Sequence, residues 1–554
     1  MEEESISTSR PTISSSWWIL GTSTLAGLLS LPVLVVLGYL FIPAGEIWSH
    51  LYNTVLIDYI SNSLILMLGV AVGSLLLGVG TAWLASMCSF PGRKVFEWML
   101  LLPLAIPAYI IAYTYTGMLD YSGPVQTTLR EVTGWGYGDY WFPEIRSLWG
   151  AAVMLSLVLY PYVYLLARAA FLNQSLCVLE VSRTLGNSPW RTFFIVALPL
   201  ARPAIVAGLS LALMETLADY GTVQYFGVST FTTGIFRTWY GLDNAAAAAQ
   251  LSALLLMFVF ALIMFERHSR RKSRYHNTSQ RHQSIKLIPL QGWQSVAAVS
   301  YCGLVVLFGF LLPAGQLTVW AATISEVVID EAFIDLIMNS LKLAGMASLS
   351  ALVLALFLGY GQRLHNSRIV RLSVRLSGMG YAVPGTVIAV GVIIPFAWVD
   401  NTLDGWMRSQ FDISTGLLLS GSLFALLFAY LVRFLAVSLQ TVESGLGRIK
   451  PSIDEAARSL GCGPNKVLRL IHLPMLRGSL LTALLLVFVD VLKELPATLI
   501  LRPFNFNTLA VRAYELAADE RLADAAPASL AIVLAGIIPV ILLSYSITRS
   551  RKTK

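Results

Sequence analysis

Four acidic residues stand at matching places in two apolar stretches of the chain. Glu215 and Asp219 are four residues apart in the first stretch, and Asp490 and Glu494 are four residues apart in the second. A spacing of four places each pair on one face of a helix. Acidic side chains in a membrane span are costly and usually face a cavity or a transport path. Their hard oxygen atoms suit a hard, highly charged cation.

A structural role for these acids is the alternative interpretation. Basic residues that could neutralise them are present in both stretches, namely Lys493, Arg237 and Arg512. Because a lysine directly precedes the last acid, we rank the first pair, Glu215 and Asp219, above the second as residues that line a substrate path. The sequence assigns no metal site.

The acid pairs belong to a longer sequence repeat. The second pair follows the first by 275 positions (490 − 215 and 494 − 219). At the same offset, a polar segment recurs that reads EVSRTLGNSPWRTFFIVALPLARPAI from Glu180 and EAARSLGCGPNKVLRLIHLPMLRGSL from Glu455. The chain is therefore two homologous halves fused together.

Each polar segment predicts a short helix, a bend and a second helix. In the second copy, Ser452 and Glu455 fit the capping box that starts a helix, and Gly461 stands where a chain leaving a helix can adopt positive φ. Pro464 suits the first turn of the next helix. The first copy predicts the same stop and restart, with Gly186 followed by a proline three residues later. Two matching polar elements in an apolar chain favour docking surfaces for a soluble partner over ordinary connectors.

The composition is that of a polytopic membrane protein. The 554 residues are 56% hydrophobic and 12% charged, whereas soluble proteins average about 25% charged residues. The expected fold is an all-α integral membrane protein of about twelve transmembrane helices. The predicted spans are residues 18–41, 62–87, 97–119, 148–170, 199–220, 248–266, 296–320, 339–362, 376–399, 415–438, 474–493 and 529–548.

Basic residues predict which side of the membrane each loop faces. Lys and Arg concentrate after the second, sixth and eighth predicted spans and in the C-terminal tail, and such residues gather on the cytoplasmic side. Both termini and both polar segments are therefore expected in the cytoplasm. An even number of spans in each half makes the halves parallel repeats. We divide the chain into a first half (1–266), a basic cytoplasmic linker (267–295) and a second half (296–554).

The polar segments resemble the EAA loop of ABC importer permeases, whose pattern is E-A-A-x₃-G-x₉-I-x-L-P. The second copy matches the whole pattern, at Glu455, Ala456, Ala457, Gly461, Ile471, Leu473 and Pro474. The first copy keeps Glu180, Gly186, Leu198 and Pro199 but has Val181, Ser182 and Val196 at the other positions. The resemblance implies coupling helices that dock on a cytoplasmic ATPase, through Glu180, Gly186, Glu455, Ala456, Ala457 and Gly461.

The chain has no G-x-x-x-x-G-K-[ST] phosphate loop of its own. ATP is therefore expected to be used by a partner subunit. We expect no tightly bound cofactor and no enzymatic activity of the chain itself.

Longer stretches resemble the fused permeases of bacterial ferric-iron ABC importers. They include LPLAIPAYIIAYTY (102–115), ETLADYGTVQYFGVSTFTTGIFRTWYG (215–241) and KELPATLILRPFNFNTLAVRAYELAADE (493–520). The resemblance implies a multi-pass protein of the bacterial inner membrane that imports ferric ion. Its implied partners are an extracytoplasmic binding protein and a cytoplasmic ATPase, in two copies. Alternatives are an ABC permease for another small substrate such as thiamine, an ion-coupled secondary transporter, or a membrane scaffold.

Isolated histidine and tyrosine residues are interpreted structurally. His472, inside the second polar segment, is expected to be a surface histidine. Tyr113, Tyr115 and Tyr220 carry phenol oxygens that a ferric ion could bind, but we predict helix packing for each.

Overall fold

The computed structural model describes residues 13–552, apart from 44, 137, 174–181, 183, 272–286, 329 and 366. In this part of the chain the structure is almost entirely helical, which confirms the predicted all-α membrane fold. The strands β1 and β2 form a parallel pair of two residues each. The predicted coupling residue Glu180 and most of the predicted linker lie outside the described residues.

The elements of the first half are α1 (Ile13–Gly38), η1 (Tyr39–Phe41), α2 (Glu46–Thr54), α3 (Leu56–Met87), β1 (Cys88–Ser89), α4 (Arg93–Met99), η2 (Leu102–Ala105), α5 (Ala108–Leu119), α6 (Pro124–Thr133), α7 (Leu148–Asn173), α9 (Pro189–Thr192), η3 (Phe193–Ala197), α10 (Leu198–Ala218), α11 (Gly221–Tyr225), α12 (Phe231–Phe236), η4 (Arg237–Gly241) and α13 (Ala245–Arg271). Those of the second half are β2 (Ile288–Pro289), α14 (Trp293–Val306), η5 (Leu307–Leu311), α15 (Leu312–Val328), α16 (Glu331–Leu364), α17 (Arg368–Ser377), η6 (Gly380–Ala382), α18 (Gly385–Phe411), α19 (Leu423–Gly447), α20 (Pro451–Ser459), α21 (Pro464–Val467), η7 (Leu468–His472), α22 (Leu473–Leu492), α23 (Pro496–Leu501), α24 (Leu509–Ala518) and α25 (Leu522–Lys552).

Among the described residues, 11 helices are long and apolar enough to cross a membrane, or up to 12 if one bent pair forms a single span. The bent pair joins Arg93–Ala105 to Ala108–Thr133 at 92° and coincides with the predicted span 97–119. The break lies at Ile106, whose backbone is extended (φ −98°, ψ 118°), because a residue before proline avoids the helical region. About twelve spans are therefore confirmed, with the third one broken.

The helices form two compact units that do not follow the two sequence halves. Unit 1 comprises Met1–Val35, Leu341–Val383 and Gly391–Val491, and unit 2 comprises Val36–Ser340, Pro384–Val390 and Leu492–Lys554. Most of α1 thus packs with helices of the second half, while α14 packs with helices of the first. The division at 266 and 296 remains a prediction about the sequence repeat.

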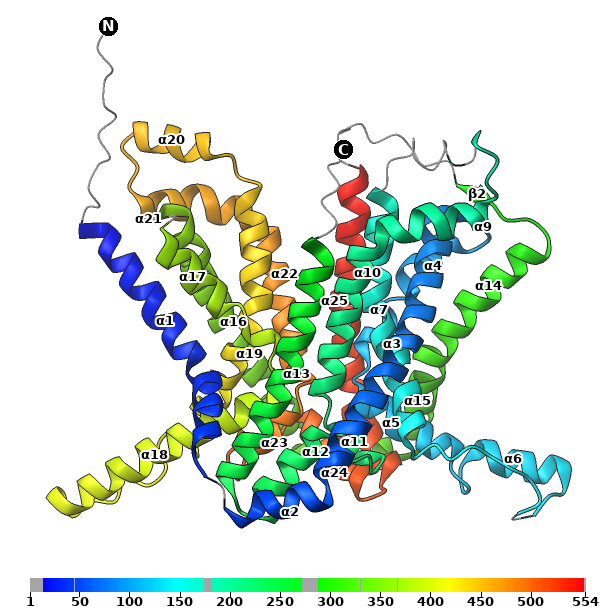
Figure 1. The fold of residues 1–554 in the computed structure, drawn as a ribbon, viewed down its shortest axis with the longest axis horizontal. Helices are drawn as coiled ribbons and strands as arrows, with labels where there is room; N and C mark the ends of the chain where they lie inside the picture. The colour runs from blue at the N-terminus through cyan, green and yellow to red at the C-terminus, as the bar shows by residue number, and fades with distance from the viewer. Residues whose placement is uncertain are drawn as a thin grey trace, which may run out of the picture. The chain divides into compact units, whose positions relative to one another are not determined.

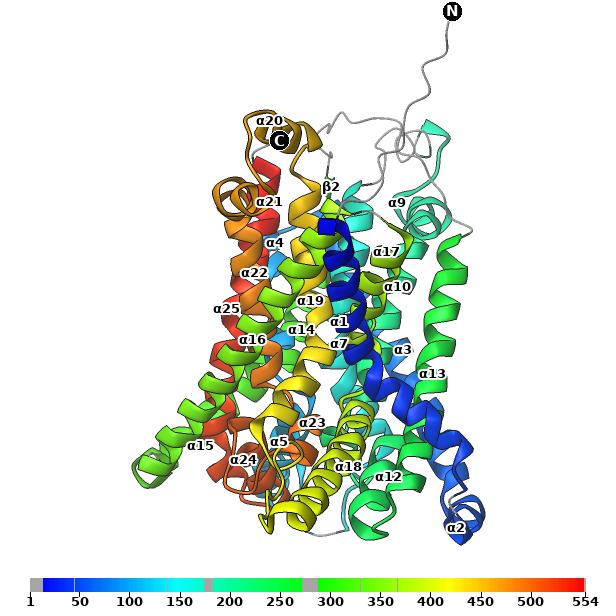
Figure 2. The ribbon, with the colours of Figure 1, turned by 90° about the vertical axis from the view of Figure 1, so that its left-hand side faces the viewer.

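Small residues let the helices of unit 1 approach closely. The Trp18 ring of α1 stacks on the Phe357 ring of α16, with the two ring centroids 5.0 Å apart. A Cβ on Gly391 of α18 would lie 2.3 Å from the Pro32 carbonyl oxygen of α1. Without a hydrophobic driving force in lipid, such close backbone contact is a main source of helix association. Within this unit, α20 and α21 lie at one end of α16, α19 and α22, and α18 extends from the other (Figures 1 and 2).

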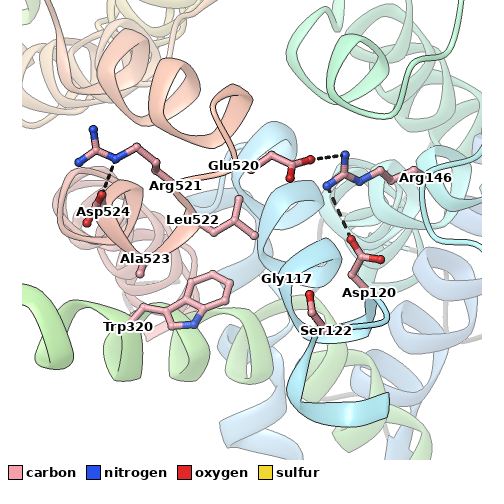
Figure 3. A pocket seen from close by; sticks show the side chains of 10 residues that line it. All are labelled: Gly117, Asp120, Ser122, Arg146, Trp320, Glu520, Arg521, Leu522, Ala523 and Asp524. Carbon is pink, nitrogen blue, oxygen red and sulfur yellow. Dashed lines mark hydrogen bonds and ion pairs between the residues drawn. The ribbon is translucent and has the colours of Figure 1, made fainter. Parts of the chain in front are cut away.

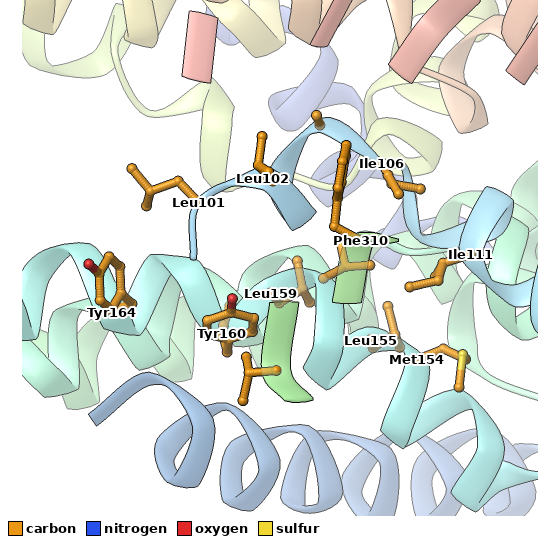
Figure 4. Packing of buried hydrophobic residues seen from close by; sticks show 14 of the residues in the cluster. Leu101, Leu102, Ile106, Ile111, Met154, Leu155, Leu159, Tyr160, Tyr164 and Phe310 are labelled. Atoms are coloured by element: carbon orange, nitrogen blue, oxygen red, sulfur yellow. The ribbon is translucent and has the colours of Figure 1, made fainter. Parts of the chain in front are cut away.

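Unit 2 is built around α3, α7 and α10. A Cβ on Gly78 of α3 would lie 2.9 Å from the Tyr160 carbonyl oxygen of α7, so this glycine permits the close packing of the two helices. On its other side, α7 packs leucine and tyrosine side chains against the segment around η2 (Figure 4). The Tyr160 hydroxyl donates a 2.8 Å hydrogen bond to the Leu100 carbonyl oxygen there. Within this unit, α9 lies at one end of the bundle, and α12 and α24 lie at the other (Figures 1 and 2).

We expect Gly380→Ala to destabilise unit 1. A Cβ at this position would lie 1.7 Å from the Val432 carbonyl oxygen, and overpacking a tight site typically costs about 1–3 kcal/mol. Gly345→Ala is the matched control, because nothing lies within 4 Å of its added Cβ. The thermal midpoint of the detergent-solubilised chain, followed by size-exclusion chromatography after heating, should fall for Gly380→Ala and not for Gly345→Ala. Equal midpoints for both variants would show that the contact at Gly380 relaxes without cost.

Candidate functional site

The second polar segment forms the predicted helix, bend and helix. The first helix, α20, begins at Pro451, and no side chain caps its N-terminus. The predicted capping box of Ser452 and Glu455 is therefore wrong, because proline takes the first helical position and places Ser452 inside the helix. Gly461 adopts φ +77° at the bend, and Pro464 begins α21. Both of these predictions are confirmed.

The first polar segment repeats this geometry where the structure describes it. Gly186 adopts φ +83°. After the glycine, the Asn187 amide donates to the Ser182 carbonyl oxygen at 3.2 Å, as the Cys462 amide donates to Ala457 at 3.0 Å in the second copy. This bond closes a helix end of the Schellman type. The first copy therefore keeps the bend despite its departures from the sequence pattern.

Each bend leads into a membrane helix through a π-helical turn. These turns, η3 and η7, start 275 positions apart (468 − 193). In each, the amide of the leucine before proline, Leu198 or Leu473, donates to the carbonyl oxygen five residues earlier. Because proline has no backbone N–H, one hydrogen bond of the helix is missing at each Leu-Pro step, and the helix widens there into a π-helical turn.

Apolar side chains are exposed at matching places of the two elements. Leu185 is 76% exposed and Leu460, 275 positions later (460 − 185), is 83% exposed. Ile195 and Leu470 form a second matched and exposed pair. Exposed apolar side chains rimmed by polar residues mark interaction sites. The two polar segments, called the docking elements below, therefore share one pattern of exposed apolar side chains.

The predicted coupling residues of α20 differ in their exposure to solvent. Glu455 and Ala456 are exposed and can contact a partner, whereas Ala457 is buried beneath them. In the first copy Gly186 is exposed, and Glu180 lies outside the described residues.

A buried charge cluster holds α20 in place. Asp454 accepts hydrogen bonds from Arg363 Nε at 2.7 Å and pairs with His472 Nε2 at 2.6 Å. The same arginine also donates to the carbonyl oxygens of Leu446 and Ile449. Burial opposes ionisation of Asp454, but the bonds from Arg363 and His472 outweigh it and hold the pKa of this carboxyl below its ordinary value. The cluster ties α20 to α16, to the end of α19 and to η7.

The prediction of a surface histidine at position 472 is wrong. The His472 ring is fully buried and packs edge-on against Tyr360 at 5.5 Å. Sequence reasoning missed this burial, because Tyr360, which packs on the ring, is distant along the chain.

Hydroxyl groups make contacts among the described residues of the first copy. The hydroxyls of Ser182 and Thr192 lie 3.1 Å apart, and Asn187 Nδ2 donates to the Ser182 hydroxyl at 3.3 Å. The serine that departs from the alanine of the pattern thus contacts α9, on the other side of the bend.

Two of the four candidate acids cap short helices. The Asp219 carboxylate accepts hydrogen bonds from the backbone amides of Thr222 and Val223, both at 3.1 Å, at the start of α11. Glu494 accepts from the Ala497 amide at 3.1 Å at the start of α23. Acidic residues favour such N-terminal positions. Sequence reasoning missed this role, although the helix breaks after both acids were a signal for it.

The acids do not all fall in one unit. Glu215, Asp219 and Glu494 belong to unit 2, and Asp490 belongs to unit 1. In the described part of the chain, no three His, Cys, Asp or Glu side chains lie close enough to hold a metal ion together. The role of the four acids along a substrate path, and their arrangement as a ring, remain predictions.

Asp219 lies far from the docking element of its own half. Helix α10 has 21 residues, begins directly after η3 and ends at the residue before Asp219. At 1.5 Å per residue this separates the two by about 30 Å. The candidate acids of α10 and α11 therefore stand at the end of unit 2 opposite to α9.

A polar pocket opens at that same end of unit 2. It has a volume of about 310 Å³ and lies between the end of α5, α15 and the start of α25. Arg146 bridges two acids there, at 3.0 Å from Glu520 and 3.7 Å from Asp120 (Figure 3). None of these three residues stood out in the sequence, because they come from distant segments.

Comparison with known proteins identifies the family. A family described as binding-protein-dependent transport system inner membrane component matches residues 74–274 and again residues 351–552. The two matches cover well over half of the chain, one in each half.

Individual relatives agree with this match. An Fe(3+)-transport system permease protein, FbpB 2, of Haemophilus influenzae is 27% identical over 93% of this chain and 96% of its own length. A ferric transport system permease protein, FbpB, of Actinobacillus pleuropneumoniae is 25% identical over 80% of this chain and 65% of its own length. A molybdenum transport system permease protein, ModB, of Haemophilus influenzae is 29% identical over 36% of this chain and 86% of its own length. With two copies of the domain in one multi-pass helical chain, this protein belongs to the family of binding-protein-dependent transport system inner membrane components, as a fused permease of two halves.

Proposed function

We propose that this chain is the permease of an importer that moves ferric ion across the bacterial inner membrane. The observation that carries the proposal is the full-length likeness to an Fe(3+)-transport permease, which spans both halves. The molybdenum permease aligns with about one third of the chain. Carboxylates at the end of α10 also suit a cation better than an anionic substrate.

The ATPase subunits that supply the energy of transport bind at the two docking elements. A permease of this family works with a substrate-binding protein and an ATPase. Two docking elements fit two ATPase subunits, which use the ATP, while the permease itself needs no tightly bound cofactor. Leu185 and Leu460 supply exposed apolar contacts, and the predicted coupling residues Glu180, Gly186, Glu455, Ala456, Ala457 and Gly461 shape the two surfaces.

Motion passes from each element into a membrane helix. The second element continues through η7 into α22, and the first continues through η3 into α10. The Asp454 cluster fixes α20 to α16, to the end of α19 and to η7. A displacement of α20 by the ATPase therefore moves these elements together with α20. ATP-driven closure of the ATPase pair then changes which side of the membrane the substrate path faces.

We expect the Gly186→Val, Gly461→Val double variant to lose coupling. Both glycines have positive φ, and nothing lies within 4 Å of an added Cβ, so the cost is backbone strain of about 1–2 kcal/mol for each residue. Substrate-stimulated ATP hydrolysis by the purified complex should fall by about tenfold or more, with membrane insertion unchanged. Gly463→Val is the control, because Gly463 has φ −68°. Normal transport by the double variant would contradict the coupling assignment.

The Glu215→Gln, Asp219→Asn double variant tests the path. The amide of Asn keeps an acceptor for the Thr222 and Val223 amides, so the cap of α11 survives while two charges are lost. Uptake of radiolabelled iron by cells should drop sharply, with the ATPase still bound. Asp404→Asn is the control, since its carboxylate also accepts backbone amides. Normal uptake by the double variant would make these acids purely structural.

Reporter fusions test the proposed orientation. Because Lys and Arg gather on the cytoplasmic side, a reporter fused after Lys272 should behave as cytoplasmic and one fused after Asp330 as external. A phosphatase active only outside the cytoplasm, paired with a fluorescent protein active only inside, gives opposite readings at the two positions. The same reading at both positions would overturn the assigned orientation.

A further inference from the structure

We propose that Tyr109, Tyr220 and Tyr514, together with the carboxylates of Asp219 and Glu494, form a transient binding site for ferric ion. The inference rests on the proposed function, ferric import, and assigns the place where the substrate is held on its way. All five residues belong to unit 2.

The three tyrosines come together from separate segments. Tyr109 lies in α5, Tyr220 precedes α11, and Tyr514 lies in α24. The Tyr514 ring centroid is 6.5 Å from that of Tyr109 and 6.0 Å from that of Tyr220. Tyr514 therefore stands at the centre of a cluster of phenol groups.

The two carboxylates adjoin this cluster. Asp219 directly precedes Tyr220, and Leu495, which follows Glu494, lies beside Gly221 and Tyr109. Asp219 Oδ2 accepts the amides of Thr222 and Val223, and Oδ1 accepts the Thr222 hydroxyl, which leaves a lone pair of Oδ1 for a cation. Glu494 Oε1 accepts the Ala497 amide. The hydrogen bonds to α11 and α23 thus fix the positions of the two acids without using up their ligand capacity.

A glycine lets the two acid-bearing segments meet. A Cβ on Gly221 would lie 2.7 Å from Tyr109 Cβ and 2.9 Å from Leu495 Cδ2. Gly221 follows the segment of Asp219 and Tyr220, and Leu495 follows Glu494. The absence of a side chain at Gly221 therefore brings the first acid segment, the second acid segment and α5 into contact.

The Tyr109 hydroxyl is the observation that points to a ligand. Tyr109 is only 5% exposed, and its hydroxyl has no hydrogen-bond partner among the described residues. Leaving such a group unpaired costs about 1–3 kcal/mol. The neighbouring Tyr113 and Tyr115 hydroxyls are bonded, to Ser529 and to the Phe308 carbonyl oxygen. Packing alone accounts for those two tyrosines, as their sequence predicted, but leaves the Tyr109 hydroxyl unexplained.

The charges of this site balance with ferric ion. Two carboxylates and one phenolate carry three negative charges, equal to the charge of the ion. Binding forms an iron–oxygen bond to the phenol oxygen and releases its proton to water, with no change of oxidation state. The proton returns to the phenol oxygen when the ion departs.

Visible absorption tests the site directly. A phenolate bound to ferric ion gives a charge-transfer band in the visible range, and carboxylates alone do not. The purified full-length chain in lipid nanodiscs, titrated with ferric nitrilotriacetate, should develop this band. The Tyr109→Phe, Tyr514→Phe double variant should lose most of it, while Tyr113→Phe should keep it. Phenylalanine retains each ring, and an unchanged size-exclusion profile verifies that the double variant is folded.

The outcomes separate this inference from the proposed function. A wild-type chain that supports iron uptake in cells but gives no visible band would overturn the tyrosine site and leave the proposed function intact. Retention of the band in the double variant would do the same. Iron uptake that does not depend on the chain would instead overturn the proposed function. Tyr220→Phe gives an independent check, because loss of this phenol should weaken the band without disturbing the cap at Asp219.

Discussion

Helix ends in an apolar surrounding must satisfy their own polar groups, and this constraint shapes every functional part of the molecule. Lipid offers no hydrogen bonds, so each free backbone amide needs a partner from the chain. The breaks that follow α10 and α22 meet this need with an acid, Asp219 or Glu494. At the Leu-Pro steps that lead from the docking elements into α10 and α22, π-helical turns meet it. These helix breaks therefore lie next to the candidate path residues and the proposed coupling surfaces.

The capping role changes how the acids are understood. An ionised carboxylate in a span would ordinarily be a severe cost. Backbone amides at a helix start lower that cost, because they donate to the carboxylate and align with the positive end of the helix. The structural and the transport interpretations of Asp219 are thus compatible: the cap fixes the carboxylate in place, and a passing cation can use the lone pair that remains on Oδ1.

The two docking elements share a backbone and differ in what holds it. A charged cluster around Asp454 fixes the second element, whereas hydroxyls of Ser182 and Thr192 link the first. Removing one partner of a buried charge cluster costs far more than removing one hydroxyl bond. The position of the second element therefore depends on Asp454, Arg363 and His472.

Sequence alone determined the fold class, the twofold repeat and the bends of the two polar segments. Composition and apolar length sufficed for the spans, and the positive φ of Gly186 and Gly461 followed from their place after a helix. These features are local, because residues close in sequence decide them. Only the tertiary structure decided that α1 packs with helices of the second half and α14 with helices of the first. It also decided the burial of His472 against Asp454 and the contact of Tyr109 with Tyr514. These pairings join segments far apart in the chain, and a single sequence carries no signal for which apolar helix faces will pack together.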